Sequence, residues 1–149
     1  MCGIAGLIHR GKSSSVGSEL QQMLQALKHR GPDSTGYALY ADNDGQNFIL
    51  RFKVGENVGE GSSSINEDDS VYDERKKLVD RMLSDLGARI VKENKLTPYS
   101  YRYEMKYDKD LMEFSKKVES IQSVEILSIG KSLELIKDLG DAKEVSDRY

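Results

Sequence analysis

Residues 99–107 read YSYRYEMKY and carry the clearest strand pattern in the chain. Aromatic or apolar side chains alternate with polar ones over the whole stretch, which predicts a strand with one buried face and one polar face. Such a tyrosine face could also stack on nucleic-acid bases, but no basic groove accompanies it in the sequence. We therefore expect it to pack against helices, and the flanking segments at 73–86 and 109–120 predict two of them.

The segments around this strand predict a small antiparallel α+β layer over residues 70–149. The elements expected along it are helices at 73–86, 109–120 and 131–139, and strands at 88–92, 99–107 and 124–129. Gly87 is expected to end the first helix, because glycine readily takes the left-handed conformation of a C-cap. We expect this layer to be inserted into, or appended to, the unit that precedes it.

That preceding unit covers residues 1–54 and is expected to have the order β-α-β-β. Its predicted elements are a buried strand at 4–8, a helix that starts at Ser18 and ends before Gly31-Pro32, and a pair of strands at 36–40 and 48–54. Ser18 and Gln21 have the spacing of a capping box. Turn-forming residues fill positions 41–46, between the two strands.

Residues 55–69 are rich in glycine, serine and acidic side chains and predict a flexible connection. The glycines from Gly55 to Gly61 faintly resemble a phosphate-binding loop. The Lys-Ser/Thr pair that such a loop needs is missing, so the connection is the preferred interpretation.

The bulk composition limits the classes of protein. The length of 149 residues is that of about one domain, and the formal net charge of −3 gives no reason to expect nucleic acid or an anionic membrane as partner. No apolar run approaches the ~20 residues that cross a bilayer, and the first eight residues are too short for a secretory signal. A single cysteine cannot form an internal disulfide, which fits a reducing compartment. We expect a soluble, cytoplasmic protein.

The N-terminal residues Met-Cys-Gly-Ile-Ala-Gly carry the first candidate chemistry. Removal of Met1 would leave Cys2 with a thiol and a free α-amine on the same carbon. Because a free α-amine titrates near pH ~7.7–8.0, it can take a proton from the thiol at neutral pH, directly or through water. Cys2 would then supply both a nucleophile and its base. The structural alternative is that Cys2 is a small packing residue near a frayed terminus.

A second motif, His-Arg-Gly-Pro-Asp-Ser-Thr-Gly, spans residues 29–36. Alone it describes a helix end with basic residues near the C-terminal dipole, followed by a turn. Together with MCGIAG, about 25 residues upstream, it resembles the start of the class II glutamine amidotransferases, whose glutaminase domains have the N-terminal-nucleophile hydrolase fold. The opening MCGIAGLIHRG looks most like archaeal and bacterial stand-alone proteins related to glutamate synthase.

The resemblance implies an α+β fold that begins as a partial N-terminal-nucleophile hydrolase unit of the αββα type. It makes Cys2 the nucleophile, leaves Gly3 able to approach the substrate closely, and makes Arg30 and Gly31 the segment packed beside Cys2. The implied reaction hydrolyses L-glutamine to glutamate and ammonia, which passes to a synthase domain or subunit. No cofactor and no metal are implied.

The chain departs from the family pattern after residue 54. The family uses a His-x-Arg segment to grip the substrate carboxylate, an Asn-Gly pair for the oxyanion hole, and an aspartate for the substrate amine. Here the only histidines are His9 and His29, and no Asn-Gly pair occurs. We therefore expect the chain to be a fragment that ends before these segments, with residues 70–149 as an insertion.

Two alternatives stay open at this point. The chain could be a non-catalytic module that keeps the amidotransferase scaffold and docks on a synthase partner, or an unrelated α+β interaction protein. Retention of Met1 would favour the first alternative, because the α-amine of Cys2 would then be tied up in a peptide bond.

Overall fold

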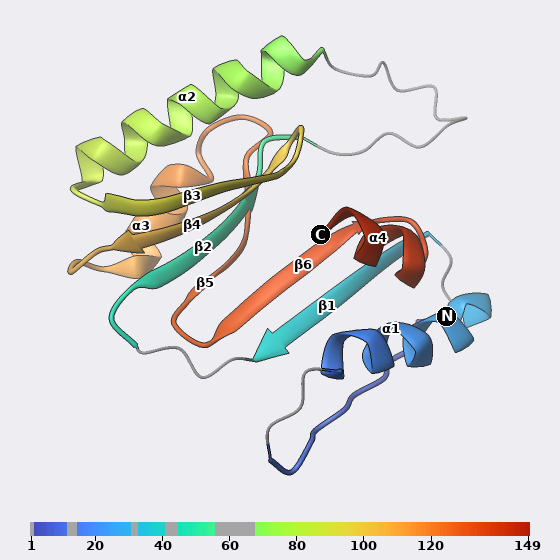
Figure 1. The fold of residues 1–149 in the computed structure, drawn as a ribbon. Helices are drawn as coiled ribbons and strands as arrows, with labels where there is room; N and C mark the ends of the chain where they lie inside the picture. Colours follow the sequence, from blue (N-terminus) through green and yellow to red (C-terminus); the bar gives the residue numbers. More distant parts are fainter. Residues whose placement is uncertain (1, 12–14, 31–32, 41–44, 56–67) are drawn as a thin grey trace. The chain divides into compact units, whose positions relative to one another are not determined.

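The computed structural model describes residues 2–11, 15–30, 33–40, 45–55 and 68–149, and Figure 1 shows their arrangement into helices and strands. In chain order the elements are α1 (Val16–Ala26), the 3₁₀ helix η1 (Lys28–Arg30), β1 (Ser34–Tyr40), β2 (Phe48–Lys53), α2 (Asp69–Leu86), β3 (Arg89–Thr97), β4 (Ser100–Lys106), α3 (Leu111–Val118), β5 (Glu125–Gly130), β6 (Leu133–Leu139) and α4 (Ala142–Arg148). The predicted α+β class is confirmed. The more specific N-terminal-nucleophile hydrolase fold stays a prediction.

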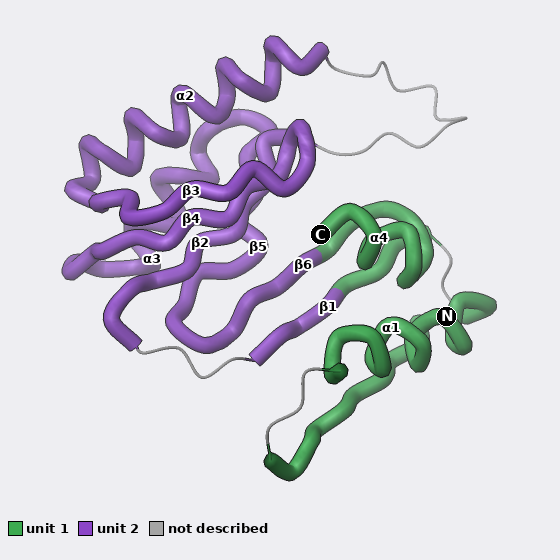
Figure 2. The backbone as a smooth tube through the Cα atoms, viewed as in Figure 1, with its two compact units in different colours: residues 1–36, 137–149 green, residues 37–136 purple. Residues whose placement is uncertain are grey.

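The chain divides into two compact units, coloured separately in Figure 2. Unit 1 combines residues 1–36 with 137–149, and unit 2 is the continuous segment 37–136. The expected segments were 1–54, 55–69 and 70–149. The two units are defined by how densely their residues contact one another. That division does not test which residues belong to the glutaminase domain and which to an insertion, so the three expected segments stay a prediction. Most of the expected connection at 55–69 lies outside the described residues, and its last residue, Asp69, already belongs to α2.

Unit 2 is built on a four-stranded antiparallel sheet with strand order β3-β4-β2-β5. Helices α2 and α3 contribute to the apolar core that covers one face of this sheet. The strand at 99–107 supplies the aromatic side of the core, as predicted, because Tyr101, Tyr103 and Met105 are buried there. Phe52 of β2 stacks on Tyr101, with ring centroids 5.4 Å apart. The tyrosine face therefore packs against helices.

Both helices of unit 2 begin at an aspartate cap, and α2 starts at Asp69, four residues before the predicted start at 73. The Asp68 side chain accepts a hydrogen bond from the backbone N–H of Ser70 at the start of α2, and Gly87 ends that helix with a φ of +86°. Helix α3 begins two residues later than the predicted start at Asp108. Its cap is Asp110, whose carboxylate accepts the backbone N–H of Glu113 at 2.7 Å.

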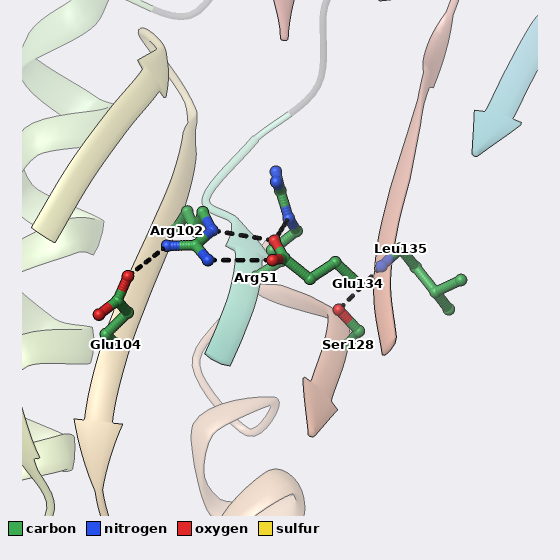
Figure 3. A network of polar contacts seen from close by, with 6 residues as sticks. All are labelled: Arg51, Arg102, Glu104, Ser128, Glu134 and Leu135. Atoms are coloured by element: carbon green, nitrogen blue, oxygen red, sulfur yellow. Dashed lines mark hydrogen bonds and ion pairs between the residues drawn. The ribbon is translucent and has the colours of Figure 1, made fainter. Parts of the chain in front are cut away.

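The other face of the sheet is polar and carries a network of ion pairs (Figure 3). The Glu134 carboxylate of β6 accepts hydrogen bonds from Arg51 Nε at 2.6 Å and from Arg102 Nε and Nη2, each at 2.9 Å. Arg102 also donates to Glu104 at 2.9 Å. Arg51 of β2 and Arg102 of β4 are directly opposite in register, so one carboxylate neutralises two adjacent guanidinium groups.

Strand β6 replaces the helix that we expected at 131–139, so that prediction is wrong. Its Leu, Glu and Lys residues favour a helix on intrinsic propensity. Pairing with β1 in a separate two-stranded sheet overrides that preference. The helix of this region is α4, which begins later, and its capping box is formed by Asp141 and Glu144.

Strands β1 and β2 form where they were predicted, but they do not pair with each other. Both edges of β2 are already occupied, by β4 and by β5, so no edge is free for β1. Strand β1 pairs with β6 instead.

The predicted buried strand at 4–8 is absent. Residues 2–10 have no regular secondary structure, and Ile4 and Ile8 are 92% and 93% exposed. A strand needs a neighbour to accept and donate its backbone hydrogen bonds, and no described strand pairs with this segment. The apolar pattern alone therefore did not produce a strand.

Helix α1 starts earlier than its sequence indicated. Ser15 occupies the N-cap position, and Ser18 lies inside the helix, where its hydroxyl donates to the Ser15 carbonyl at 2.9 Å. The capping box predicted at Ser18 is therefore wrong. The helix ends at Ala26 and continues as η1. The stop predicted at Gly31-Pro32 lies outside the described residues.

Candidate active site

Cys2 lies in the extended N-terminal segment of unit 1 and is an exposed free thiol. Its neighbour Met1 is outside the described residues. An exposed thiol can meet a substrate and a base, whereas a buried packing cysteine could not do either. The exposure of Cys2 is compatible with the nucleophile role, which stays a prediction.

Gly3 connects this segment to the end of helix α1. A Cβ atom placed on Gly3 would lie 3.2 Å from the Cβ of Leu27 and 3.6 Å from the Cβ of Arg30. Contact this close leaves little room for a side chain at position 3, so glycine lets the backbone lie against the helix end. The structure thus places Gly3, the residue that follows Cys2, beside Arg30. Gly31 lies outside the described residues.

A small hollow of about 80 Å³ lies beside Gly3, within unit 1. Helix α1 contributes Leu24 and Leu27, β1 contributes Ser34 and Thr35, and the start of α4 contributes Asp141. Cys2 itself is not among the lining residues. The hollow brings the start of β1 to the N-terminal segment, although about 30 residues of sequence separate them.

Asp141 is the carboxylate nearest to this hollow, and sequence reasoning missed it. It caps α4 by accepting the Glu144 backbone N–H at 3.0 Å, and it accepts a hydrogen bond from Gln25 at 3.1 Å. These two hydrogen bonds, in that order, hold the pKa of Asp141 below its usual value. Its acceptor capacity is used to join α1 to α4, so we assign it a structural role. The signal in the sequence was the D-A-K-E capping-box spacing.

A buried carboxylate, Asp138, has the same kind of role. It is fully enclosed in unit 1, where Arg148 forms an ion pair with it at 3.1 Å and the Tyr149 hydroxyl donates to it at 3.2 Å. The Asp138 carboxylate also accepts the backbone N–H of Leu139. These partners fix the end of α4 on β6. They also occupy the carboxylate oxygens of Asp138, so we do not assign it the role of a catalytic acid.

The two histidines lie apart from any catalytic arrangement among the described residues. His9 Nε2 is 3.1 Å from a Glu19 carboxylate oxygen on α1, in an exposed pair. His29 is exposed within η1.

Across the described parts of the chain, no three His, Cys, Asp or Glu side chains are grouped closely enough to hold a metal ion. The helices described also include none with the length and apolar character needed to span a membrane.

Comparison with known proteins agrees with the position of these motifs. Residues 1–50 match the family model of the glutamine amidotransferase domain. The whole chain is 34% identical to a protein of Methanothermobacter thermautotrophicus that is named "Putative glutamine amidotransferase". The chain spans 47% of the length of that relative. Residues 1–50, which contain Cys2, Gly3 and Arg30, thus carry the sequence pattern of a glutamine amidotransferase domain.

Proposed function

We propose that this chain provides the nucleophile of a class II glutaminase, with Cys2 as the N-terminal residue of the mature protein. The observation that supports this most directly is the close approach of Gly3 to Leu27 and Arg30. It ties the Cys2 end of the chain to the helix end that begins the second motif. A nucleophile must be held within a fraction of an ångström to react efficiently, and a loose terminus could not provide that.

In the proposed reaction the Cys2 Sγ attacks the side-chain amide carbon of L-glutamine. The thiol proton passes to the α-amine, directly or through one water, and then to the departing nitrogen. The tetrahedral intermediate collapses with cleavage of the C–N bond, which releases ammonia and leaves a thioester on Cys2. Water then hydrolyses the thioester to glutamate and restores the thiol. We further propose that the ammonia passes to a synthase domain or subunit.

Arg30 and Gly31 are proposed to support this site rather than to react. Arg30 lies beside Gly3, so its backbone and side-chain stem can fix the direction of the N-terminal segment. Gly31, next in the sequence, is assigned the same supporting role on the family resemblance.

The test combines the mass of the native protein with covalent labelling. The proposal predicts loss of Met1 and stoichiometric modification of Cys2 by a glutamine-mimicking electrophile, with protection by L-glutamine. Both are read by intact-mass and peptide-mass spectrometry. Retained Met1 together with no glutamine-protected labelling would favour the non-catalytic docking module instead.

Glycine at position 3 gives a second test, because the same segment contains a matched control. Gly3→Ala is expected to lower the kcat for glutamine hydrolysis about tenfold, since the new Cβ crowds Leu27 and moves the adjacent nucleophile. Gly6→Ala adds the same methyl group where no atom lies within 4 Å, and it should leave kcat within twofold. Equal kcat values for the two variants would contradict the proposed role of Gly3. Steady-state ammonia release measures both.

A further inference from the structure

A hollow of about 460 Å³ lies at one end of the four-stranded sheet in unit 2. Its charged and polar lining comes from four separate segments of the chain: Gln46 before β2, Arg89 at the start of β3, Lys106, Tyr107 and Asp108 at the end of β4, and Lys131 in the β5–β6 turn. This volume lies within the range of small-molecule sites, about 300–1,000 Å³. The described residues that line the hollow all belong to unit 2.

The lining carries an excess of positive charge. Among the described lining residues, Arg89, Lys106 and Lys131 oppose a single carboxylate, Asp108. None of these three cations forms an ion pair with a residue in the described part of the chain. This local excess stands out in a protein whose formal net charge is −3.

Two of these cations are placed where they repel each other. Arg89 of β3 and Lys106 of β4 are directly opposite in the antiparallel register, so their side chains project from the same face of the sheet. Like charges in this position destabilise a sheet. The neighbouring carboxylate on that face, Glu104, is already bound to Arg102 at 2.9 Å. The repulsion between Arg89 and Lys106 is therefore left without compensation from this neighbour.

The remaining groups at the rim do not remove the charge excess. Lys131 Nζ lies 5.0 Å from the centroid of the Phe48 ring, a contact that holds the ammonium in place and leaves its charge intact. The negative C-terminal end of α2 is close by, but its Leu86 carbonyl already accepts a hydrogen bond from Lys109 at 2.9 Å. A bound anion would supply the missing negative charge.

We propose that this hollow binds a small phosphate-bearing molecule with at least two negative charges. A guanidinium group can donate two parallel hydrogen bonds to a phosphate, and ammonium groups act as additional point charges. Arg89 and Lys106 approach the ligand from one face of the sheet, and Lys131 approaches it from the β5–β6 turn. The three cations converge on one open hollow at the end of the sheet, so a small multivalent anion could contact all of them at once.

The probe for the test is inorganic pyrophosphate, titrated into the purified protein at constant ionic strength and followed by amide NMR spectra. We expect saturable shifts at Gly87, Lys106 and Lys131, with a Kd below about 5 mM. Citrate, which carries carboxylates in place of phosphates, is expected to bind at least about fivefold more weakly. The double variant Arg89→Gln/Lys106→Gln should weaken pyrophosphate binding about tenfold.

The matched control is Lys77→Gln/Lys116→Gln, which removes the same charge from exposed helix positions outside the hollow. It should change the Kd by less than twofold. A second readout is thermal stability: without ligand Arg89→Gln should raise Tm at low salt by relieving the repulsion with Lys106. Pyrophosphate should raise Tm more for the unmodified protein and for Lys77→Gln/Lys116→Gln than for Arg89→Gln/Lys106→Gln.

Several results would overturn the proposal. Absence of saturation up to about 20 mM, or equal weakening in the two double variants, would reduce the hollow to a solvated cationic surface. Tighter binding of citrate or of an oligoglutamate peptide than of pyrophosphate would assign the hollow to a carboxylate ligand or an acidic protein segment instead.

Discussion

Cys2→Ser is expected to lower the kcat for glutamine hydrolysis by at least about 10³-fold, with little change in the fold. Serine keeps the size and position of the side chain, and the exposed site imposes no packing cost on the exchange. The hydroxyl is a far weaker nucleophile than a thiolate, because an alcohol is far less acidic than a thiol and loses its proton only during the attack. Ammonia release under saturating glutamine measures the effect in a polypeptide that also carries the His-x-Arg and Asn-Gly segments.

The control for Cys2→Ser is the labelling reaction with a glutamine-mimicking electrophile. Wild-type protein is expected to take up one equivalent on Cys2, while Cys2→Ser should take up none and should keep the same Tm. Equal turnover by the two proteins would remove Cys2 from the role of nucleophile. Loss of turnover together with a lower Tm would show that Cys2 matters for packing, which its exposure does not support.

Glu134→Gln is expected to lower the free energy of unfolding by about 3 kcal/mol at pH 7. The carboxylate is 14% exposed, and its loss leaves the largely buried guanidinium of Arg51 without its ion-pair partner. Arg102 keeps only Glu104. Urea unfolding followed by tyrosine near-ultraviolet circular dichroism measures the change, since the chain has no tryptophan and several tyrosines lie in the core of unit 2.

The same carboxylate predicts a pH dependence of stability. Burial alone raises the pKa of Glu134, but hydrogen bonds from Arg102 and Arg51 outweigh burial and bring the pKa below its ordinary value. A lowered pKa in the folded state means that the contribution is present above the unfolded pKa, near ~4.3, and is lost as the pH falls through the folded pKa. Glu134→Gln should remove this part of the acid sensitivity.

Glu113→Gln is the matched control for Glu134→Gln, because Glu113 pairs with Lys117 on α3 and its side chain is 66% exposed. An exposed pair of this kind should change the free energy of unfolding by less than about 0.5 kcal/mol. Similar losses in the two variants would contradict a special role for the network around Glu134.

Elements whose own sequence contains their packing pattern could be predicted. The alternation at 99–107 identified the buried aromatic face of β4, and the apolar stripe and Gly87 identified α2 and its end. In both cases the buried side chains and the stop signal lie within one segment. The strand or helix could therefore be identified without knowing its partners.

Elements whose form depends on a distant partner could not be predicted. Residues 133–139 have helix-favouring residues, and only the pairing with β1, about 100 positions earlier, makes them a strand. The opposite happened at residues 4–8, where an apolar run lacks a described partner and forms no strand. In both cases non-local pairing decided the outcome and local propensity did not.

The functional residues, too, could be predicted only where they lie in one continuous stretch of sequence. Cys2 and Arg30 could be singled out because each lies in a short continuous motif, and the approach of Gly3 to Arg30 agrees with the expected neighbourhood. The cationic hollow could not be found from the sequence. Arg89, Lys106 and Lys131 are ordinary exposed residues until the register places them around one space.

The division of the chain into a continuous and a discontinuous unit has a consequence for the order of folding during synthesis. Unit 2 is one uninterrupted segment, so a ribosome translates all of its residues before it translates residues 137–149 of unit 1. Helix α1 must wait for α4, because the Gln25–Asp141 hydrogen bond joins residues 116 positions apart. The helix that lies against Gly3 is therefore translated well before residues 137–149, with which it forms unit 1.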